Sequence, residues 1–250
     1  MRSRYSSAPS SFASSFGPGP LTPAIKALVV ANVAAFVVTL ILPSVKLYLG
    51  LQPQAVVGSL HLWQPFTYMF LHDGIFHILF NMLALWMFGV ELERMWGSRF
   101  FTKYYFVTGV GAAVTTLLVS FAPMSFADQL YYSLTIGASG AVYGVLLAYA
   151  LYFPNRPIYM YFVFPIPAKY FVMIIGAISF LSSMGGAGGG VAHITHLGGL
   201  VAGYFYLKGA RINILSELKY RYLKWRINRM RRKFDVYSGG RADEVKRRVH

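Results

Sequence analysis

The sequence lacks cysteine altogether and contains few charged residues. Without cysteine the chain has no disulfide, no thiol nucleophile and no thiolate metal ligand, and cysteine usage gives no information on its compartment. Only 12% of the 250 residues are charged and 56% are hydrophobic, whereas about one quarter of the residues of a soluble domain are charged. The composition therefore predicts a protein embedded in lipid.

Several stretches without any charge support this interpretation. They cover residues 27–45, 104–127, 129–155 and 170–192, and each approaches or exceeds the roughly 20 residues that span a bilayer as a helix. The first stretch follows a polar arm and is long enough to span, so we interpret it as a membrane helix rather than a removable signal peptide.

We predict an all-α membrane protein with six transmembrane helices, at residues 23–42, 75–90, 101–121, 139–153, 170–184 and 192–207. The connection 43–74 is rich in aromatic residues, which favour the membrane interface. Three parts follow: a disordered arm at 1–22, rich in Ser, Pro and Gly, the membrane domain at 23–209, and a basic tail at 210–250.

Basic residues gather in alternate connections of this arrangement. Three lie before the first helix or in its first turn, three lie between the second helix and the first turn of the third, two lie between the fourth and fifth, and fourteen follow the sixth. The other connections contain only Lys46. The positive-inside rule therefore places both termini in the cytoplasm. The fourth and sixth helices then begin on the outer side, which puts Ser139 and His196 at similar depth.

The tail contains apolar residues at helical spacing among Lys and Arg, namely Leu215, Leu218, Tyr222 and Trp225. This pattern is typical of an amphipathic helix that lies on anionic lipids. A solvated basic tail that only fixes the topology is an equal alternative. Nucleic-acid binding ranks well behind both, and we expect no nucleic-acid partner.

Ionisable side chains inside membrane helices are costly and therefore mark candidate functional sites. Here His72, His77, His193 and His196 all lie near the outer ends of the second and sixth predicted helices. The segment 137–140, Gly-Ala-Ser-Gly, opens the fourth helix, where free N–H groups can bind an oxyanion. Taken alone, that segment is explained better by helix packing.

Two glycine pairs at four-residue spacing favour a catalytic role for the segment 137–140 over simple helix packing. They are Gly140 with Gly144, and Gly199 with Gly203. Such pairs let two membrane helices approach closely, which would bring His196 to Ser139. A neutral imidazole within hydrogen-bond reach can take the hydroxyl proton as general base. Tyr143, one turn after Ser139, is placed to pack against that imidazole.

No acidic residue lies in the last three predicted helices, so we expect a Ser–His dyad rather than a triad. His77 and Asn81 are one turn apart and suit two donors to one developing negative charge, worth roughly 3–4 kcal/mol each. An interhelical hydrogen-bond pair is the alternative. His72 is either a surface histidine or part of this network. The spacing of His193 and His196 would allow a metal site, which is disfavoured because no carboxylate joins them.

Together and in order, the motifs resemble the rhomboid family of intramembrane serine proteases, of bacterial type, over residues 65–203. They are Trp63-Gln64-Pro65-Phe66-Thr67, His72, His77, Asn81 and Met82, Glu93 with Gly97, Gly137-Ala138-Ser139-Gly140 with Tyr143, and Ala192-His193-x-x-His196-Leu197-Gly198-Gly199 with Gly203. One departure is Gln64, where some members carry arginine.

The resemblance implies a nucleophile, Ser139, and a base, His196. It implies an oxyanion hole of His77, Asn81 and the backbone N–H of Ser139, supported by Tyr143, Gly140, Gly199 and His72. It implies no metal or cofactor, a short central fourth helix below a water-filled cavity, and single-span membrane proteins as substrates. The location would be the bacterial plasma membrane. The sequence gives neither the substrate nor the oligomeric state.

Two other functions remain open from the sequence. An inactive relative that binds membrane proteins without cutting them would be expected to have lost Ser139 or His196, and both are present. A channel or transporter with a histidine proton relay is a reasonable default for buried histidines in a helical bundle. It leaves the small-residue segment around Ser139 unexplained.

Overall fold

The computed structural model describes residues 17–123, 127–160, 164–184 and 190–211, together with Tyr222, Lys224, Trp225, Ile227 and Arg229. The chain divides into two compact units, residues 1–207 and 208–250. Residues 1–16 of the predicted arm and most of the predicted tail, including Leu215 and Leu218, lie outside the described residues.

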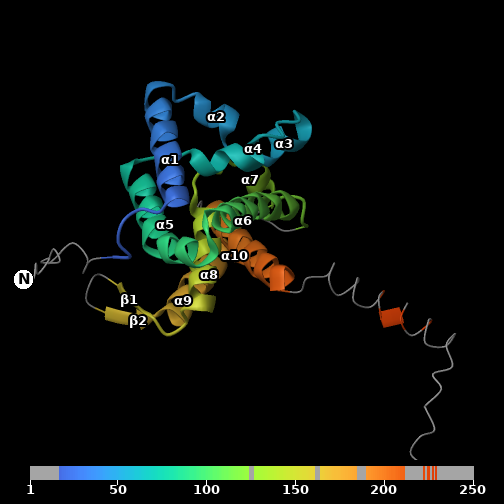
Figure 1. Cartoon of the computed structure of the whole chain (residues 1–250). Coiled ribbons are helices and arrows are strands. Elements are labelled where there is room, and N and C mark those ends of the chain that lie inside the picture. The colour runs from blue at the N-terminus through green and yellow to red at the C-terminus, as the bar shows by residue number, and fades with distance from the viewer. Residues whose placement is uncertain are drawn as a thin grey trace, which may run out of the picture. The chain divides into compact units, whose positions relative to one another are not determined.

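In the described part of the chain, a helix forms at each of the six predicted positions. These helices are α1 (Pro23–Ile41), α5 (Ile75–Trp96), α6 (Ser98–Val119), α8 (Ser139–Tyr152), α9 (Ala168–Met184) and α10 (Gly190–Arg211) (Figure 1). The short helix α8 packs against α5, α6 and α9. It is therefore the central helix of this unit, and Ser139 is its first residue.

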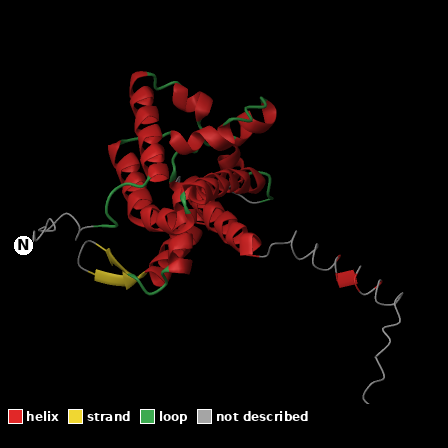
Figure 2. Ribbon diagram, in the orientation of Figure 1, coloured by secondary structure: helices red, strands yellow, loops and turns green. Residues whose placement is uncertain are grey.

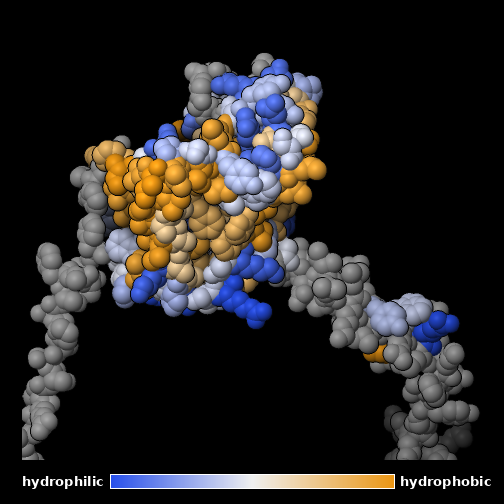
Figure 3. Space-filling model, turned by 90° about the horizontal axis from the view of Figure 1, so that it is seen from above, coloured by the Kyte–Doolittle hydropathy of each residue, from blue (hydrophilic) through white to orange (hydrophobic). Residues whose placement is uncertain are grey.

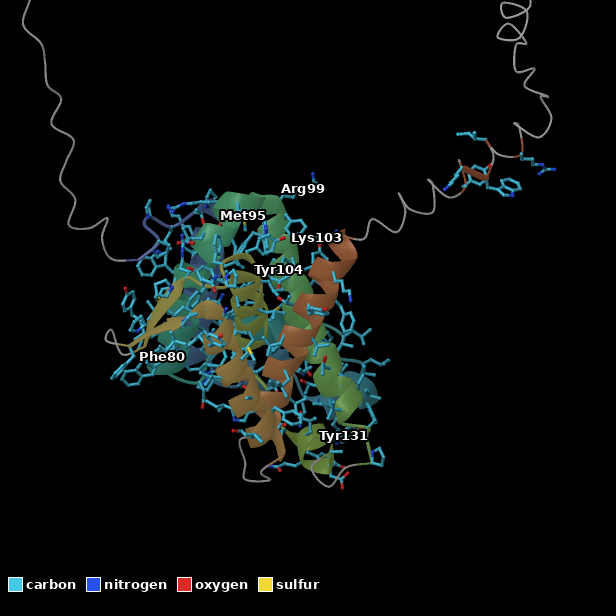
Figure 4. The ribbon with its side chains drawn as sticks, turned by 90° about the horizontal axis from the view of Figure 1, so that it is seen from below. Phe80, Met95, Arg99, Lys103, Tyr104 and Tyr131 are labelled. Atoms are coloured by element: carbon cyan, nitrogen blue, oxygen red, sulfur yellow. The ribbon has the colours of Figure 1, made fainter. Side chains whose placement is uncertain are left out.

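Two helices among the described residues, α1 and α5, are long and apolar enough to cross a membrane, with mean hydropathies of 2.3 and 1.7. The outer surface of the unit is also apolar: Phe80 is 63% exposed and points away from the bundle (Figure 4). Figure 3 shows a broad hydrophobic surface with hydrophilic residues along its lower edge. Soluble monomers rarely expose so large an apolar patch, whereas lipid favours it.

The connection between α1 and α5 folds into short helices: α2 (Val45–Leu49), α3 (Pro53–Gly58), α4 (Gln64–Thr67) and the 3-10 helix η2 (Tyr68–Phe70). Gln64 is fully buried. Its side-chain oxygen accepts a bond from the Gln52 N–H at 3.0 Å, and its amide nitrogen lies 3.3 Å from the Tyr48 carbonyl oxygen. Gln64 therefore anchors this connection.

Helix α5 continues past its predicted end at residue 90, and only Gly97, with φ +78°, separates it from α6. Charged residues beyond position 90 do not end the helix. Instead the buried Glu93 accepts bonds from the N–H groups of Ala24 (2.8 Å) and Ile25 (3.0 Å) and from the Ser98 hydroxyl (2.6 Å). Because a helix N-terminus attracts negative charge, this carboxylate caps α1 and stabilises the α5–α6 junction.

The described end of the arm, residues 17–22, differs from the predicted disorder. The Trp86 indole donates to the Gly19 carbonyl oxygen at 2.9 Å, and the Arg94 guanidinium donates to the Pro18 carbonyl oxygen at 2.5 Å. Donors on α5 thus satisfy backbone carbonyls of the arm. The Thr22 hydroxyl also bonds to Glu93.

Two further features were not predicted. An antiparallel hairpin of β1 (Pro157–Met160) and β2 (Phe164–Pro167) joins α8 to α9 (Figure 2). The short helix α7 (Ala127–Tyr132) precedes α8. Between α7 and α8, Thr135 forms a backbone bridge with Leu51, with N–H to oxygen distances of 2.8 and 2.9 Å. This bridge ties the α1–α5 connection to the segment that leads into Ser139.

Candidate active site

The hydroxyl of Ser139 and the imidazole of His196 are in contact: Oγ lies 2.8 Å from Nε2. Their helices meet backbone to backbone. A Cβ on Gly199 would lie 1.9 Å from the Gly140 carbonyl oxygen, and a Cβ on Gly203 would lie 3.3 Å from the Cα of Gly144. The two glycine pairs therefore bring α8 and α10 together as the sequence predicts, and this contact unites the two side chains.

The His196 ring is fixed on one side by an aromatic neighbour. The Tyr143 ring lies parallel to it, with centroids 4.2 Å apart and 8° between the planes. Nδ1 of His196 is buried and has no hydrogen-bond partner among the described residues. A neutral imidazole protonated at Nδ1 has a lone pair at Nε2. That tautomer suits a base that accepts the Ser139 proton.

Gly137 lies close to both His77 and Ser139. Gly137 has φ +124°, and a Cβ built on it would lie 2.7 Å from His77 Nε2 and 3.7 Å from Ser139 Oγ. The Asp73 N–H donates to His77 Nδ1 at 3.4 Å, so Nε2 of the neutral ring carries its proton. First-turn N–H groups of α8 have no intrahelical partner. The Nε2–H of His77 and the hydroxyl of Ser139 therefore both lie close to Gly137, at the start of α8.

Asn81 occupies the same face of α5 as His77, and its Nδ2 donates to the His77 carbonyl oxygen at 2.8 Å. This local bond uses one of the two N–H donors of the amide. The side chain is largely buried, with 7% exposure. Its remaining N–H is available to a second acceptor.

His72 is fully buried, which excludes the alternative of a surface histidine. Its ring lies edge-on to the His77 ring, with centroids 4.9 Å apart. The pKa of His72 is lowered to about 4, mainly by burial and also by repulsion from a protonated His77, while the Phe70 backbone opposes part of this shift. His72 is thus neutral at physiological pH and packs directly behind His77.

His193 lies one turn before His196, and the two rings meet edge to face at 5.8 Å. Its Nδ1 is buried without a hydrogen-bond partner in the described ranges. Within those ranges, no three His, Asp or Glu side chains are grouped as metal ligands. Nothing in this geometry gives His193 direct contact with Ser139.

A cavity of about 370 Å³ lies toward the other end of α8, and its lining includes Trp86, Phe88, Tyr149 and Ile158. Tyr149 follows Ser139 by ten positions, which corresponds to about 15 Å along an α-helix. This cavity is therefore separate from the Ser139–His196 pair.

Sequence reasoning missed one polar contact of the site. The hydroxyl of Ser179 on α9 donates to the Tyr143 hydroxyl at 3.3 Å. The available signal was a serine within a largely apolar helix, because buried polar groups in membranes need partners.

The fold and the site together define a helical membrane protein with a serine–imidazole pair arranged as in serine hydrolases. The sequence model of the Rhomboid domain matches residues 59–211, which is more than half of the chain. The chain therefore belongs to the rhomboid family and is an integral membrane protein.

Curated relatives agree with this assignment. Rhomboid protease GluP of Bacillus subtilis is 32% identical over 158 residues, which cover 62% of this chain and 27% of the relative. Rhomboid protein 1, mitochondrial, of Saccharomyces cerevisiae is 34% identical over 140 residues, covering 55% and 38%. Rhomboid protease AarA of Providencia stuartii is 29% identical over 155 residues, covering 56% and 53%. The chain thus spans between about a quarter and a half of these relatives.

Proposed function

We propose that this chain is an intramembrane serine endopeptidase that hydrolyses peptide bonds in or near transmembrane segments. The observation that carries the proposal is the 2.8 Å contact between Ser139 Oγ and His196 Nε2 at the N-terminus of α8. Two of the curated relatives are named rhomboid proteases, which supports the same reaction here.

In the acylation step, Nε2 of His196 takes the Ser139 proton while Oγ attacks the carbonyl carbon of the scissile bond. The carbonyl oxygen becomes an oxyanion, stabilised by the Nε2–H of His77, the amide of Asn81 and the backbone N–H of Ser139. Such donors contribute roughly 3–4 kcal/mol each to the transition state. The C–N bond then breaks, and His196 gives its proton to the leaving amine.

Deacylation repeats these steps with water. His196 removes a proton from the water molecule while the water oxygen attacks the ester carbon. The same donors stabilise the second oxyanion. The bond to Oγ breaks, the proton returns to Ser139, and the carboxylic acid product leaves. No carboxylate is needed because the Tyr143 ring holds the imidazole against Ser139.

The proposed topology has six spans with both termini in the cytoplasm, in the bacterial plasma membrane. The basic residues Arg99 and Lys103 lie at one end of the bundle and Tyr131 lies at the other (Figure 4). The positive-inside rule assigns the basic end to the cytoplasm. Single-span membrane proteins with small residues at the cleaved bond are the proposed substrates.

For the tail we propose a contact with anionic lipids. The Tyr222 and Trp225 rings lie 6.1 Å apart, and the Arg229 guanidinium lies 5.3 Å from the Trp225 ring, as expected of an interfacial basic helix. A tail peptide with Leu218 and Trp225 made polar should bind anionic vesicles more weakly than the native peptide. Equal binding would favour a solvated tail.

The test of the proposed activity is cleavage of a single-span substrate in proteoliposomes. Wild type should cut it, whereas Ser139→Ala and His196→Ala should not. Ser133→Ala is the matched control, because Ser133 is partly exposed and its hydroxyl donates to the Gln129 carbonyl oxygen at 2.5 Å, outside the Ser139–His196 pair. Cleavage that persists in Ser139→Ala contradicts the proposal.

A further inference from the structure

Helix α9 contacts the candidate site through one buried hydroxyl group. Ser179 is 1% exposed, and its Oγ donates to the Tyr143 hydroxyl oxygen at 3.3 Å. A hydroxyl buried away from water needs a partner, since leaving it unpaired is costly. This bond therefore stabilises one position of the Tyr143 phenol group relative to α9.

The position of the Tyr143 phenol is important because its ring stacks on the imidazole of His196. Tyr143 stacks on His196 at 4.2 Å with only 8° between the planes, so a tilt of one ring must tilt the other. Among the described residues, Nδ1 of His196 has no partner that could hold the imidazole independently. The imidazole is therefore held by its hydrogen bond to Ser139, by the stacked face of Tyr143 and by the more distant edge-to-face contact with His193.

We propose that Ser179 is a positioning residue for the base His196 and acts through Tyr143. The inference rests on the proposed function, because it assigns a role within the same site. Ser179 fixes the phenol, the phenol fixes the imidazole plane, and the imidazole plane directs Nε2 at Ser139 Oγ. A further consequence is that the reactivity of Ser139 depends on the position of α9. This dependence does not require a direct contact between α9 and the Ser139–His196 pair.

The first experiment compares Ser179→Ala with Ser179→Thr in the proteoliposome cleavage assay. A net hydrogen bond of ordinary strength corresponds to a rate change of about three- to tenfold. Ser179→Ala should lower kcat by that factor with little change in KM, because the base is misdirected while substrate binding is kept. Ser179→Thr retains a hydroxyl and should restore most of kcat.

Ser183→Ala is the matched control. Ser183 lies one turn further along α9, is 4% exposed, and donates to the Phe180 carbonyl oxygen of its own helix at 2.6 Å. It removes a buried hydroxyl from the same helix without touching Tyr143. The control should keep the wild-type kcat. An equal loss of kcat in Ser179→Ala and Ser183→Ala means a general effect on α9 and overturns the proposal.

A double-mutant cycle tests the route through the phenol. Tyr143→Phe keeps the ring but removes the hydroxyl, so Ser179→Ala should have no further effect on kcat in that background. Independent, multiplicative losses would show that Ser179 acts by another route. Melting temperatures of all variants, measured in parallel, identify any variant whose lower kcat reflects a smaller folded fraction.

Failure of this inference is distinguishable from failure of the proposed function. A fluorophosphonate probe that labels wild type at Ser139 supports the nucleophile, whatever Ser179 does. If Ser179→Ala is then labelled and turns over at the wild-type rate, the positioning role alone is wrong. If wild type is not labelled at Ser139, the proposed function fails first.

Discussion

Gly199 and Gly140 touch through their backbones, so that a single added carbon on Gly199 would lie 1.9 Å from the Gly140 carbonyl oxygen. Ser139 is the neighbour of one glycine, and His196 lies one turn before the other. The distance between the candidate nucleophile and base is therefore set by the absence of two side chains. The hydrogen bond between Ser139 and His196 therefore depends on the backbone contact between Gly199 and Gly140.

Gly199→Ala should separate α8 from α10 and break the contact between Ser139 and His196. Overpacking of this kind costs about 1–3 kcal/mol of stability, and the base also moves out of reach. We expect a lower melting temperature and loss of cleavage in the folded fraction. Gly176→Ala is the control, because its Cβ would meet only Leu200 at an ordinary 3.4 Å. Full activity of Gly199→Ala contradicts this account.

Asn81→Ala should lower kcat about 10²-fold while the protein stays folded, as expected when one oxyanion donor is lost. Asn32 offers a matched control, because it is buried and its Nδ2 donates to the carbonyl oxygen one turn earlier, Leu28, at 2.8 Å. Asn32→Ala removes the same local bond on α1, away from the site. Turnover should fall only in Asn81→Ala; equal turnover numbers in the two variants exclude Asn81 from the oxyanion hole.

The stability of the fold should decrease as the pH is lowered through a range set by the pKa of His72. Its pKa is about 4 in the fold, against the ordinary value of 6.5 expected in the unfolded chain. Between these values the unfolded chain binds more protons, so stability is lost as the pH falls from 6.5 toward 4 and changes little further below. His72→Gln should flatten this part of a plot of melting temperature against pH. An unchanged slope would show that other groups cause it.

Glu93→Ala should destabilise the bundle without acting on the chemistry. The substitution leaves the buried N–H groups of Ala24 and Ile25 and the hydroxyl of Ser98 without their acceptor, at about 1–3 kcal/mol per group. We expect a clearly lower melting temperature, with a near-normal kcat per folded molecule. Glu91→Ala is the comparison, because its ion pair with Arg156 is partly exposed and such pairs contribute about 0–1 kcal/mol. Equal melting temperatures for the two variants would rule out the capping role.

Much of the fold could be predicted because apolar runs and small-residue spacing are local properties of the sequence. The contact between Ser139 and His196 followed from two glycine pairs and a shared depth. The end of α5 could not be predicted, because the buried Glu93 depends on partners about seventy positions away as well as on the nearby Ser98. Charge next to an apolar run suggests a boundary unless such partners are known.

The hydrogen-bond partners of Asn81 and Ser179 in the site could not be predicted from the sequence either. The spacing of His77 and Asn81 left open two donors to one anion or an interhelical hydrogen-bond pair. The observed bond, from Asn81 to the His77 carbonyl oxygen, lies within α5 itself and was not predicted. Ser179 gave no periodic signal, since its importance depends on which neighbour its hydroxyl meets. The hairpin of β1 and β2 lies in a short connection without a recognisable turn motif.

The central claim is that Ser139 is a nucleophile activated by His196. The most direct test is labelling of the purified protein with a fluorophosphonate probe, followed by mass spectrometry of the modified peptide. We predict one adduct, on Ser139, that is absent in Ser139→Ala and strongly reduced in His196→Ala. An adduct that persists in Ser139→Ala, or equal labelling of wild type and His196→Ala, would contradict the account.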